Sequence, residues 1–453
     1  MTRVLVLATT TGYQTRAFGD AAGRLGVELV FATDRCHLIE DPWTDGAVPI
    51  RFYDEDAAVA AILESAAARP IDGLLVVGDR PTVIAARVAA ALGLPWHPPA
   101  AAAIARNKLL TRERLRDAGL NVPWFHTRPL AAGTDTRVGP RPTHGSAATF
   151  PCVVKPLALS GSRGVMRADD ERELAAALDR LRALVRSPDV RAERNEAHDT
   201  ALVEGFIPGR EYAVEGLLHC GELHVLAIFD KPDPLDGPFF EETIYVTPSR
   251  ASHADERAIV DSVAGAAAAI GLFHGPIHAE CRVNDDGVFV LEVAARPIGG
   301  LCARALRFTA RAATSHKSQV ERSLVPEPAS SFEELLLRHA SGEAVHGWRR
   351  ESSASGVMMI PIPRRGIYRG VTGIDLARAE PHVDDVRITA KVDQLLQPLP
   401  EGASYLGFIF ARADAPAEVE RALRDAHARL RFTVDPEFPV LAAAEINYNQ
   451  RHG

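Results

Sequence analysis

Two glutamates, Glu280 and Glu292, lie in apolar, β-branched segments on either side of Asp285-Asp286-Gly287. The pattern predicts a β-hairpin with a three-residue loop and Gly287 in the left-handed conformation. That register sets the two glutamates opposite each other, whereas a two-residue loop would turn them to opposite faces. Opposed carboxylates repel each other, and Mg²⁺, which commonly binds one or two carboxylates together with substrate phosphates, would remove the repulsion. The hairpin therefore predicts a magnesium site; the alternative is the solvated face of an ordinary hairpin.

The same register places further polar side chains beside the two glutamates. His278 would be opposite Ala294, and Arg282 would be opposite Val290. Because side chains alternate along a strand, His278 and Arg282 would share a face with the glutamates and with Arg296. The predicted hairpin thus gathers acidic and basic groups on one surface.

A phosphate-binding segment is expected around Lys155. Residues 150–154 form an apolar strand that leads to this lysine, and PLALSGSRGV follows it. Glycines let the backbone approach phosphate oxygens, successive amides can form an anion-binding nest, and the ammonium neutralises charge. The P-loop pattern GxxxxGK[ST] is missing. The alternative is a hairpin turn with an exposed lysine.

A nucleoside pocket is a second expectation. The strand at 201–203 leads into EGFIPGRE, an apolar connector with an acid at each end. Backbone groups and Glu204 would serve the adenine edge, Phe206 and Ile207 its face, and Glu211 the ribose hydroxyls. Taken alone, this motif favours a plain connection between strands.

Composition limits the class of protein. The chain has 453 residues, 47% hydrophobic and 24% charged, which predicts two to four globular domains. A net charge of −8 argues against a nucleic-acid partner. The five cysteines form no CxxC pair, so neither zinc nor a disulfide framework is indicated. No apolar run is long enough to span a membrane, and the start MTRVLVLATT resembles a first strand rather than a signal peptide. We expect a cytoplasmic protein.

The first hundred residues alternate strand and helix. Strands are expected at 4–8, 27–32 and 73–77, with helices ending near 25 and covering 57–68. Pro81 suits the first residue of the next helix. This rhythm predicts a doubly wound parallel sheet that binds ligands at the carboxyl ends of its strands.

The rest of the chain is less regular. One amphipathic helix closed by Gly119 is expected within 95–126, and a β-rich region begins at Phe150. It contains helices near 170–186 and 254–270 and a solvated loop at 186–200. A smaller α+β unit should follow residue 312, with helices and strands at 332–339, 356–362, 366–371, 404–411 and 415–431.

Taken in order, these motifs resemble the ATP-grasp superfamily over roughly residues 1–310: Lys108, Lys155 with SGSRG, VEGFIPGREY, HAE and LEVAARPIGG. Within that superfamily, GPFFEETIYVTP at 237–248 and the ARPIGG ending resemble the L-amino-acid ligases, which join two amino acids into a dipeptide. The resemblance implies an α/β and α+β multidomain protein. It would have an N-terminal doubly wound parallel α/β domain at 1–105, a central ATP-grasp domain at 106–312 and a small C-terminal α+β domain at 313–453.

The resemblance also implies roles for residues that bind ATP. Lys108 and Lys155 would contact its phosphates, and Lys155 would act in catalysis. Gly161 and Ser162 would lie in a flexible loop over the phosphates. The residues expected around the nucleoside are Glu204, Gly205, Phe206 and Ile207 at the adenine and Glu211 at the ribose.

For the substrate and metal, the resemblance implies that Arg296 steadies the substrate carboxylate and the transferred phosphate, as a catalytic residue. Gly299 and Gly300 would present backbone amides. Glu242 and His278 would contact the amino-acid substrate.

Glu280 and Glu292 would hold Mg²⁺, with Mn²⁺ as a possible substitute. ATP-grasp enzymes commonly have Asn two residues after the second metal glutamate, where this chain has Ala294. Alanine offers no ligand atom, so either one or two metal ions remain consistent with the sequence.

The function implied is an ATP-dependent carboxylate–amine ligase that forms an acyl phosphate, releases ADP and phosphate, and makes an amide bond. The substrates would be small carboxylates and amines, and a homodimer is usual in related enzymes. Two alternatives stay open: an ATP-grasp carboxylase of the biotin-carboxylase type, and a catalytically silent nucleotide-binding protein.

Overall fold

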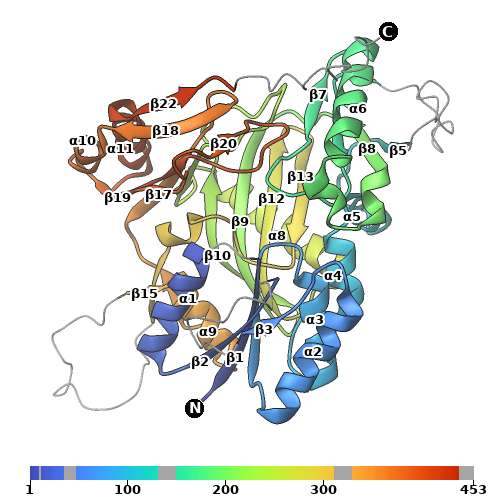
Figure 1. Ribbon diagram of the computed structural model, residues 1–453, viewed down its shortest axis with the longest axis vertical. Coiled ribbons are helices and arrows are strands. Elements are labelled where there is room, and N and C mark those ends of the chain that lie inside the picture. Colours follow the sequence, from blue (N-terminus) through green and yellow to red (C-terminus); the bar gives the residue numbers. More distant parts are fainter. Residues whose placement is uncertain (10–11, 35–46, 131–148, 311–328, 438–453) are drawn as a thin grey trace, which may run out of the picture.

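The computed structural model describes residues 1–9, 12–34, 47–130, 149–310 and 329–437. Three layered units surround a central sheet, with the N-terminal unit at one end of the molecule and the C-terminal unit beside the sheet (Figure 1). None of the helices in these ranges is long and apolar enough to cross a lipid bilayer.

The N-terminal unit is a four-stranded parallel sheet in the order β3-β2-β1-β4, as its strand–helix rhythm predicted. Its strands are β1 (Arg3–Ala8), β2 (Glu28–Thr33), β3 (Val48–Pro49) and β4 (Gly73–Val77). Its helices are α1 (Gly12–Leu25), α2 (Glu55–Ala68) and α3 (Thr82–Leu92). Pro81 is the residue before α3 rather than its first residue. The carboxyl end of β4 carries the sequence GDRP toward the middle of the molecule.

The single helix expected within 95–126 is wrong, because the structure has two. They are α4 (Pro99–Ala105) and α5 (Lys108–Asp117). Asn107 breaks the helix: its backbone is extended, and its side chain accepts hydrogen bonds from the backbone N–H groups of Leu109 and Leu110. This is an N-cap. Lys108 is therefore the first residue of α5, at a helix start rather than on a helix face.

A small antiparallel sheet has the order β5-β8-β6-β7. Its strands are β5 (Phe125–Pro129), β6 (Cys152–Pro156), β7 (Met166–Ala168) and β8 (Thr200–Gly205), and α6 (Glu171–Val185) packs on it. The expected loop at 186–200 contains helical turns, α7 (Pro188–Arg191) and the 3₁₀ helix η1 (Glu196–Asp199). Strand β6 includes Lys155, so the sheet fixes the backbone from which the lysine side chain extends.

The central sheet has eight strands in the order β13-β12-β9-β10-β11-β17-β21-β19. The bounds are β9 (Arg210–His219), β10 (Glu222–Asp230), β11 (Ile244–Thr247), β12 (Gly275–Asn284), β13 (Gly287–Ala294), β17 (Ala354–Ile360), β19 (Val383–Ile388) and β21 (Gly407–Ala413). Helix α8 (His253–Ile270) packs against β13, β10 and β12. Because β17 pairs with β11, one sheet continues from the central region into the C-terminal region.

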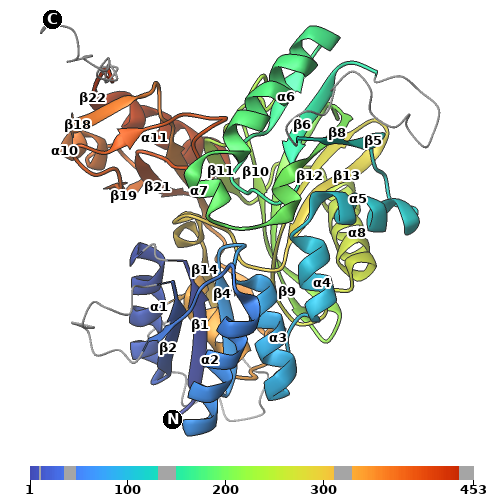
Figure 2. The same ribbon diagram turned by 45° about the vertical axis from the view of Figure 1, so that its right-hand side comes forward.

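The described elements after residue 300 either pack against the N-terminal unit or form the C-terminal unit. The elements η2 (Cys302–Ala305), β14 (Arg307–Ala310), β15 (Ser330–Ser331), α9 (Phe332–Ala340) and β16 (Trp348–Arg350) follow β13. Helix α9 packs against α1 and β4, on the opposite side of the N-terminal sheet from α2 and α3 (Figures 1 and 2). The C-terminal unit adds β18 (Gly366–Thr372), α10 (Ile374–Arg378), β20 (Leu395–Leu396), α11 (Pro416–Arg429) and β22 (Arg431–Asp435). The expected domain boundary at 105/106 stays a prediction, and the one expected at 312/313 lies outside the described residues.

The hairpin of β12 and β13 places Glu280 opposite Glu292 and His278 opposite Ala294, as expected. Its loop has two residues rather than three, because Asn284 pairs with Gly287. A loop of that length alone would have separated the glutamates.

A β-bulge restores the register. Val290 is opposite Cys281 while Glu292 is opposite Glu280, so Leu291 is the extra residue of β13. Arg282 consequently faces Phe289, and the expected pairing with Val290 is wrong. The inserted residue compensates for the shorter turn.

Candidate active site

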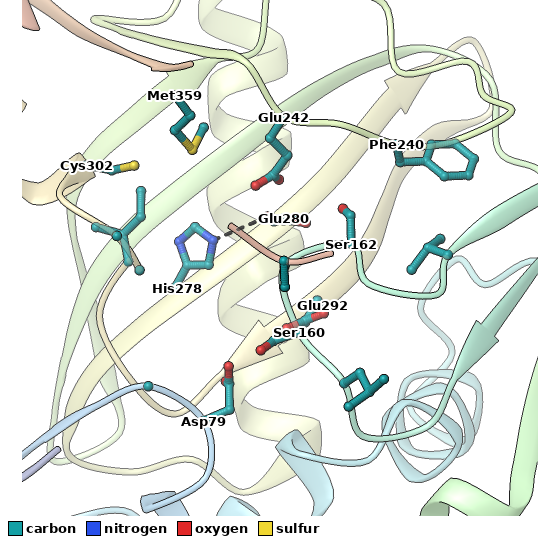
Figure 3. A pocket seen from close by; sticks show the side chains of 18 of the residues that line it. Asp79, Ser160, Ser162, Phe240, Glu242, His278, Glu280, Glu292, Cys302 and Met359 are labelled. Atoms are coloured by element: carbon teal, nitrogen blue, oxygen red, sulfur yellow. Dashed lines mark hydrogen bonds and ion pairs between the residues drawn. The ribbon is translucent and has the colours of Figure 1, made fainter. Parts of the chain in front are cut away.

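A cavity of about 790 Å³ lies where the N-terminal, central and C-terminal units meet (Figure 3). Its volume is that of a small-molecule site. All the residues that the sequence proposed for the site line it: Lys108, Lys155, Gly161, Ser162, Glu204, Gly205, Phe206, Ile207, Glu211, Glu242, His278, Glu280, Glu292, Arg296, Gly299 and Gly300.

The two opposed glutamates line this cavity, and Figure 3 shows Glu280 joined to His278. Glu280 Oε1 lies 3.1 Å from Lys231 Nζ and 3.4 Å from His278 Nε2. Glu292 Oε2 lies 3.4 Å from Lys108 Nζ. The side chains of Glu280 and Glu292 are 22% and 25% exposed, so both can reach a ligand.

Lys231, which the sequence analysis missed, joins three carboxylates. Its ammonium donates to Glu211 Oε1 at 2.8 Å and to Glu242 Oε1 at 2.5 Å, besides its contact with Glu280. Burial would lower the pKa of Lys231, but the three carboxylates outweigh burial and raise it well above its usual value. Lys231 directly follows the largely apolar strand β10. Lys155 was selected because it follows an apolar segment, so the same signal could have identified Lys231.

The neighbouring charges in this cluster shift the pKa values of Glu242 and Glu280 in opposite directions. Burial and the neighbouring Glu280 raise the pKa of Glu242 to about 7. Burial acts in the same direction on Glu280, but Lys231 and His278 outweigh it and hold the pKa of Glu280 well below its usual value. Glu280 therefore holds a proton less tightly than Glu242 does.

Glu211 is held by a second cation. Arg282 Nε donates to Glu211 Oε2 at 2.8 Å, and Arg282 Nη1 donates to the carbonyl of Ile207 at 2.6 Å. The guanidinium also lies over the rings of Phe206 and Phe240, 5.1 and 5.7 Å from their centroids. Arg282 therefore fixes the connector after β8 against the beginning of β9.

Lys155 is part of a buried triad with Glu204 and Arg112. Arg112 donates from Nε and Nη2 to the two oxygens of Glu204 at 2.8 and 3.1 Å, and Lys155 Nζ contacts Glu204 Oε1. Burial would raise the pKa of Glu204, but the two cations lower it to about 2. Burial, the largest influence, lowers the pKa of Lys155. Glu204, expected at the adenine edge, thus also positions Lys155.

The segment after Lys155 turns back over the cavity. Lys108 Nζ donates to the carbonyl of Leu159 at 2.7 Å, and Gly161 and Ser162 have φ values of 63° and 54°. The backbone N–H of Gly164 donates to the carbonyl of Pro400 at 2.8 Å. The Ser/Gly segment therefore bridges Lys108 and the C-terminal unit.

Arg296 is bound by Asp79, a residue that the sequence analysis did not select. Nε and Nη2 of Arg296 donate to Oδ1 and Oδ2 of Asp79 at 2.8 and 3.1 Å. Burial would raise the pKa of Asp79, but Arg296 outweighs it and lowers the pKa. The signal was present, because Asp79 follows the carboxyl end of parallel strand β4, where ligands bind in α/β sheets.

His278 is oriented by Glu215. Its Nδ1 hydrogen-bonds to Glu215 Oε1, and Glu215 Oε2 accepts the backbone N–H of Ile298 at 3.1 Å. Burial would lower the pKa of His278, but Glu215 and Glu280 outweigh it and raise the pKa to about 9. The fully buried Glu215 thus connects His278 to the backbone just before Gly299 and Gly300.

Comparison with protein families follows this order of units. Residues 19–96 match an ATP-grasp N-terminal domain, residues 148–305 an ATP-grasp domain, and residues 358–435 an L-amino acid ligase C-terminal domain 2. The chain is an ATP-grasp protein that resembles the L-amino acid ligases. The matches confirm the expected fold class and enzyme class, and the ATP-grasp domain implies that the chain binds ATP.

One solved structure and two further relatives are consistent with these family matches. An L-amino acid ligase from Bacillus licheniformis is 27% identical, with a TM-score of 0.76 over 96% of this chain and 99% of that one. The ATP-grasp enzyme fsqD of Aspergillus fumigatus is 27% identical, and carnosine synthase 1 of Gallus gallus is 28% identical, each over 60% of this chain. The matched segment spans 46% and 30% of those two proteins, less than half their length.

Proposed function

We propose that this protein is an ATP-dependent carboxylate–amine ligase that condenses two amino acids into a dipeptide through an acyl phosphate. The observation that supports this most is the meeting of three groups in one cavity. These are the lysines Lys108 and Lys155, the opposed pair Glu280 and Glu292, and the paired guanidinium of Arg296. Adenine binding alone would not require the last two groups.

The opposed carboxylates suit a divalent cation. Glu280 and Glu292 are paired directly across the hairpin, and each also contacts a cation of the protein. When bound, Mg²⁺ or Mn²⁺ would neutralise phosphate charge between these two side chains. Ala294 is buried and adds no ligand, so a second ion would rely on phosphates and water.

In the first step, an oxygen of the substrate carboxylate attacks the γ-phosphorus of ATP, and ADP leaves. Positioning and charge neutralisation dominate such transfers. Arg296 is suited to hold the carboxylate and then the acyl phosphate, because its planar guanidinium can bind two oxygens at once. In the second step, the amine attacks the carbonyl carbon, phosphate leaves, and the nitrogen loses a proton.

Glu242 and His278 divide the remaining work. With a pKa of about 9, His278 is protonated at neutral pH. It is therefore suited to bind the substrate carboxylate rather than to act as a base. Glu242 has a pKa of about 7 and can accept the proton of the incoming ammonium group. Gly299 and Gly300 follow the segment tied to Glu215 and would present backbone amides to the carboxylate.

Amino acids are proposed as both substrates because the relatives include an L-amino acid ligase and carnosine synthase 1. The wall around Glu242 and His278 is partly apolar, with Met359, Cys302 and Phe408 lining the same cavity. This wall suits an uncharged side chain on one of the two amino acids. A homodimer stays a prediction.

The test is nucleotide product analysis with Mg²⁺ and ATP, using amino acids offered singly and in pairs. ADP and phosphate that appear only with particular pairs, together with the mass of a condensed product, would support the proposal. AMP and pyrophosphate would mean adenylation and would refute it. A parallel arm with bicarbonate and one amine tests carboxylation. The Arg296→Lys variant should still bind ATP and lose most turnover.

A further inference from the structure

A cluster of histidines lies at the other end of β9 from Glu211. His219 ends β9, His274 directly precedes β12, and His339 is in the last turn of α9. One ligand nitrogen from each of these three residues lies within 4.8 Å of the other two. Nδ1 of His219 is 3.4 Å from Nε2 of His339, and the rings of His274 and His339 are stacked with centroids 4.4 Å apart.

The 3.4 Å between the ring nitrogens of His219 and His339 suits one shared cation. Two nitrogens on a tetrahedral zinc ion, each about 2.0–2.1 Å from the metal, are about 3.4 Å apart. His274 is only 5% exposed, and among the described residues its Nδ1 has no hydrogen-bond partner. A buried polar atom without a partner is costly and requires an explanation. A metal ion in the cluster would supply one.

His97 shows what a structural histidine looks like in the same neighbourhood. Its Nδ1 accepts the backbone N–H of Phe273 at 3.2 Å, and its Nε2 lies 3.1 Å from the carbonyl of Pro276. Both ring nitrogens are therefore used to hold the turn that carries His274. The contrast between the satisfied His97 and the unsatisfied His274 separates a supporting residue from a ligand.

We propose that His219, His274 and His339 bind one divalent transition-metal ion, with Zn²⁺ as the probe of choice. Imidazole favours this class of ion over Mg²⁺. A fourth position would be open to water or to His346, whose ring centroid is 5.6 Å from that of His219.

The elements that carry the ligands give the ion a structural role. His219 ends β9 and His274 directly precedes β12, both strands of the central sheet, whereas His339 belongs to α9, which packs against α1 and β4 of the N-terminal unit. That sheet supplies Asp79 to Arg296. A metal ion here would tie together the two units whose relative position sets the Asp79–Arg296 contact.

The experiment uses the full chain without an affinity tag, dialysed against a chelator and then saturated with Mg²⁺ and ATP. Zn²⁺ titrated by calorimetry should bind with one equivalent and raise Tm. Co²⁺ should give the visible absorption of a tetrahedral site. The His274→Asn and His339→Asn variants should weaken Zn²⁺ binding by at least about 100-fold, since even outer-shell changes cost 10- to 100-fold.

Two controls decide the interpretation. His253→Asn removes a histidine whose side chain is fully exposed and should leave Zn²⁺ binding unchanged. Glu280→Gln should also retain Zn²⁺, which separates this site from the proposed catalytic cation. If a buried variant does not fold, His219→Asn, at a half-buried position, replaces it. No Co²⁺ spectrum in the unmodified protein, or equal Zn²⁺ binding by the histidine variants, would overturn the proposal.

Discussion

The carboxylate of Asp79 and the guanidinium of Arg296 form a two-pronged ion pair, at 2.8 and 3.1 Å, across 217 positions of sequence. Asp79 follows the last strand of the N-terminal sheet, and Arg296 follows β13 of the central sheet. The side chain of Arg296 is 9% exposed and lines the cavity. The N-terminal unit therefore positions the arginine that we propose binds the reacting carboxylate.

Replacing Asp79 tests this positioning. Asp79→Asn keeps the size of the side chain but removes the charge that holds Arg296. We expect kcat to fall by about 100-fold, because a displacement of about 1 Å costs that much. The dissociation constant of ATP, measured by calorimetry, should stay within about twofold.

Asp72→Asn is the matched control, since Asp72 lies in the same unit and accepts a hydrogen bond from the backbone N–H of Arg3 at 2.8 Å. It should leave kcat within about twofold, as exposed substitutions usually do. An Asp79→Asn protein with the kcat of the unmodified enzyme would show that Arg296 needs no partner.

The buried triad of Arg112, Glu204 and Lys155 predicts a large effect on stability. Glu204→Gln leaves two buried cations without their counter-charge, which should cost about 3–5 kcal/mol of unfolding free energy. Urea unfolding at pH 7 measures it. Glu343→Gln, which breaks the more exposed pair with Arg338, should cost less than about 1 kcal/mol.

Glu204 also predicts a pH dependence of unfolding. Its pKa in the folded protein is about 2, below the ordinary 4.5, so its contribution is fully present above pH 4.5 and is lost as the pH falls toward 2. The difference in unfolding free energy between the unmodified protein and Glu204→Gln should shrink across that interval. A difference that stays constant from pH 5 to pH 2 contradicts the assignment.

For Glu242 we expect the free energy of unfolding to change with pH in the opposite direction. Its folded pKa is raised from 4.5 to about 7, so ionisation destabilises the fold as the pH rises through that interval. Glu242→Gln should therefore raise Tm at pH 8 relative to the unmodified protein, and the gain should disappear at pH 4.5. Its ligase activity should fall, because the proposed proton acceptor is gone. Calorimetric scans at the two pH values test the first part, and a lower Tm at pH 8 would refute it.

The glutamate pair predicts a change in metal requirement. Glu292→Gln should raise the Mg²⁺ concentration needed for half-maximal activity by at least about 10-fold, because one of two carboxylate ligands is lost. Mn²⁺ should restore part of the activity. Glu222→Gln, at the exposed start of β10, serves as the control. An unchanged Mg²⁺ requirement in Glu292→Gln would remove Glu292 from the metal site.

The pairing of Glu280 with Glu292 was predictable because a hairpin is local: alternation along two adjacent segments sets which side chains meet. The route to that pairing was not, since a two-residue loop and a bulge at Leu291 together give the same register as a three-residue loop. The shorter loop and the bulge compensate for each other, so the apolar pattern predicted the correct pairing but neither irregularity.

The partners of the site residues were less predictable. The strands and helices that carry or directly precede these partners have neighbours set by sheet order, not by proximity in sequence; the partners are Lys231, Glu215, Arg112 and Asp79. The pairing of β17 with β11, which carries the central sheet into the C-terminal region, is of the same kind. Long-range pairing leaves no periodic signal, so the sequence indicated which residues carry charge but not which cations neutralise them.

The most direct test of the central claim follows an oxygen atom. The donor amino acid is labelled with ¹⁸O in its carboxylate, and the products are analysed by mass spectrometry after condensation. An acyl-phosphate route transfers one ¹⁸O to inorganic phosphate for each dipeptide formed and none to ADP. Label found in AMP, or phosphate that carries no ¹⁸O, would contradict the mechanism proposed here.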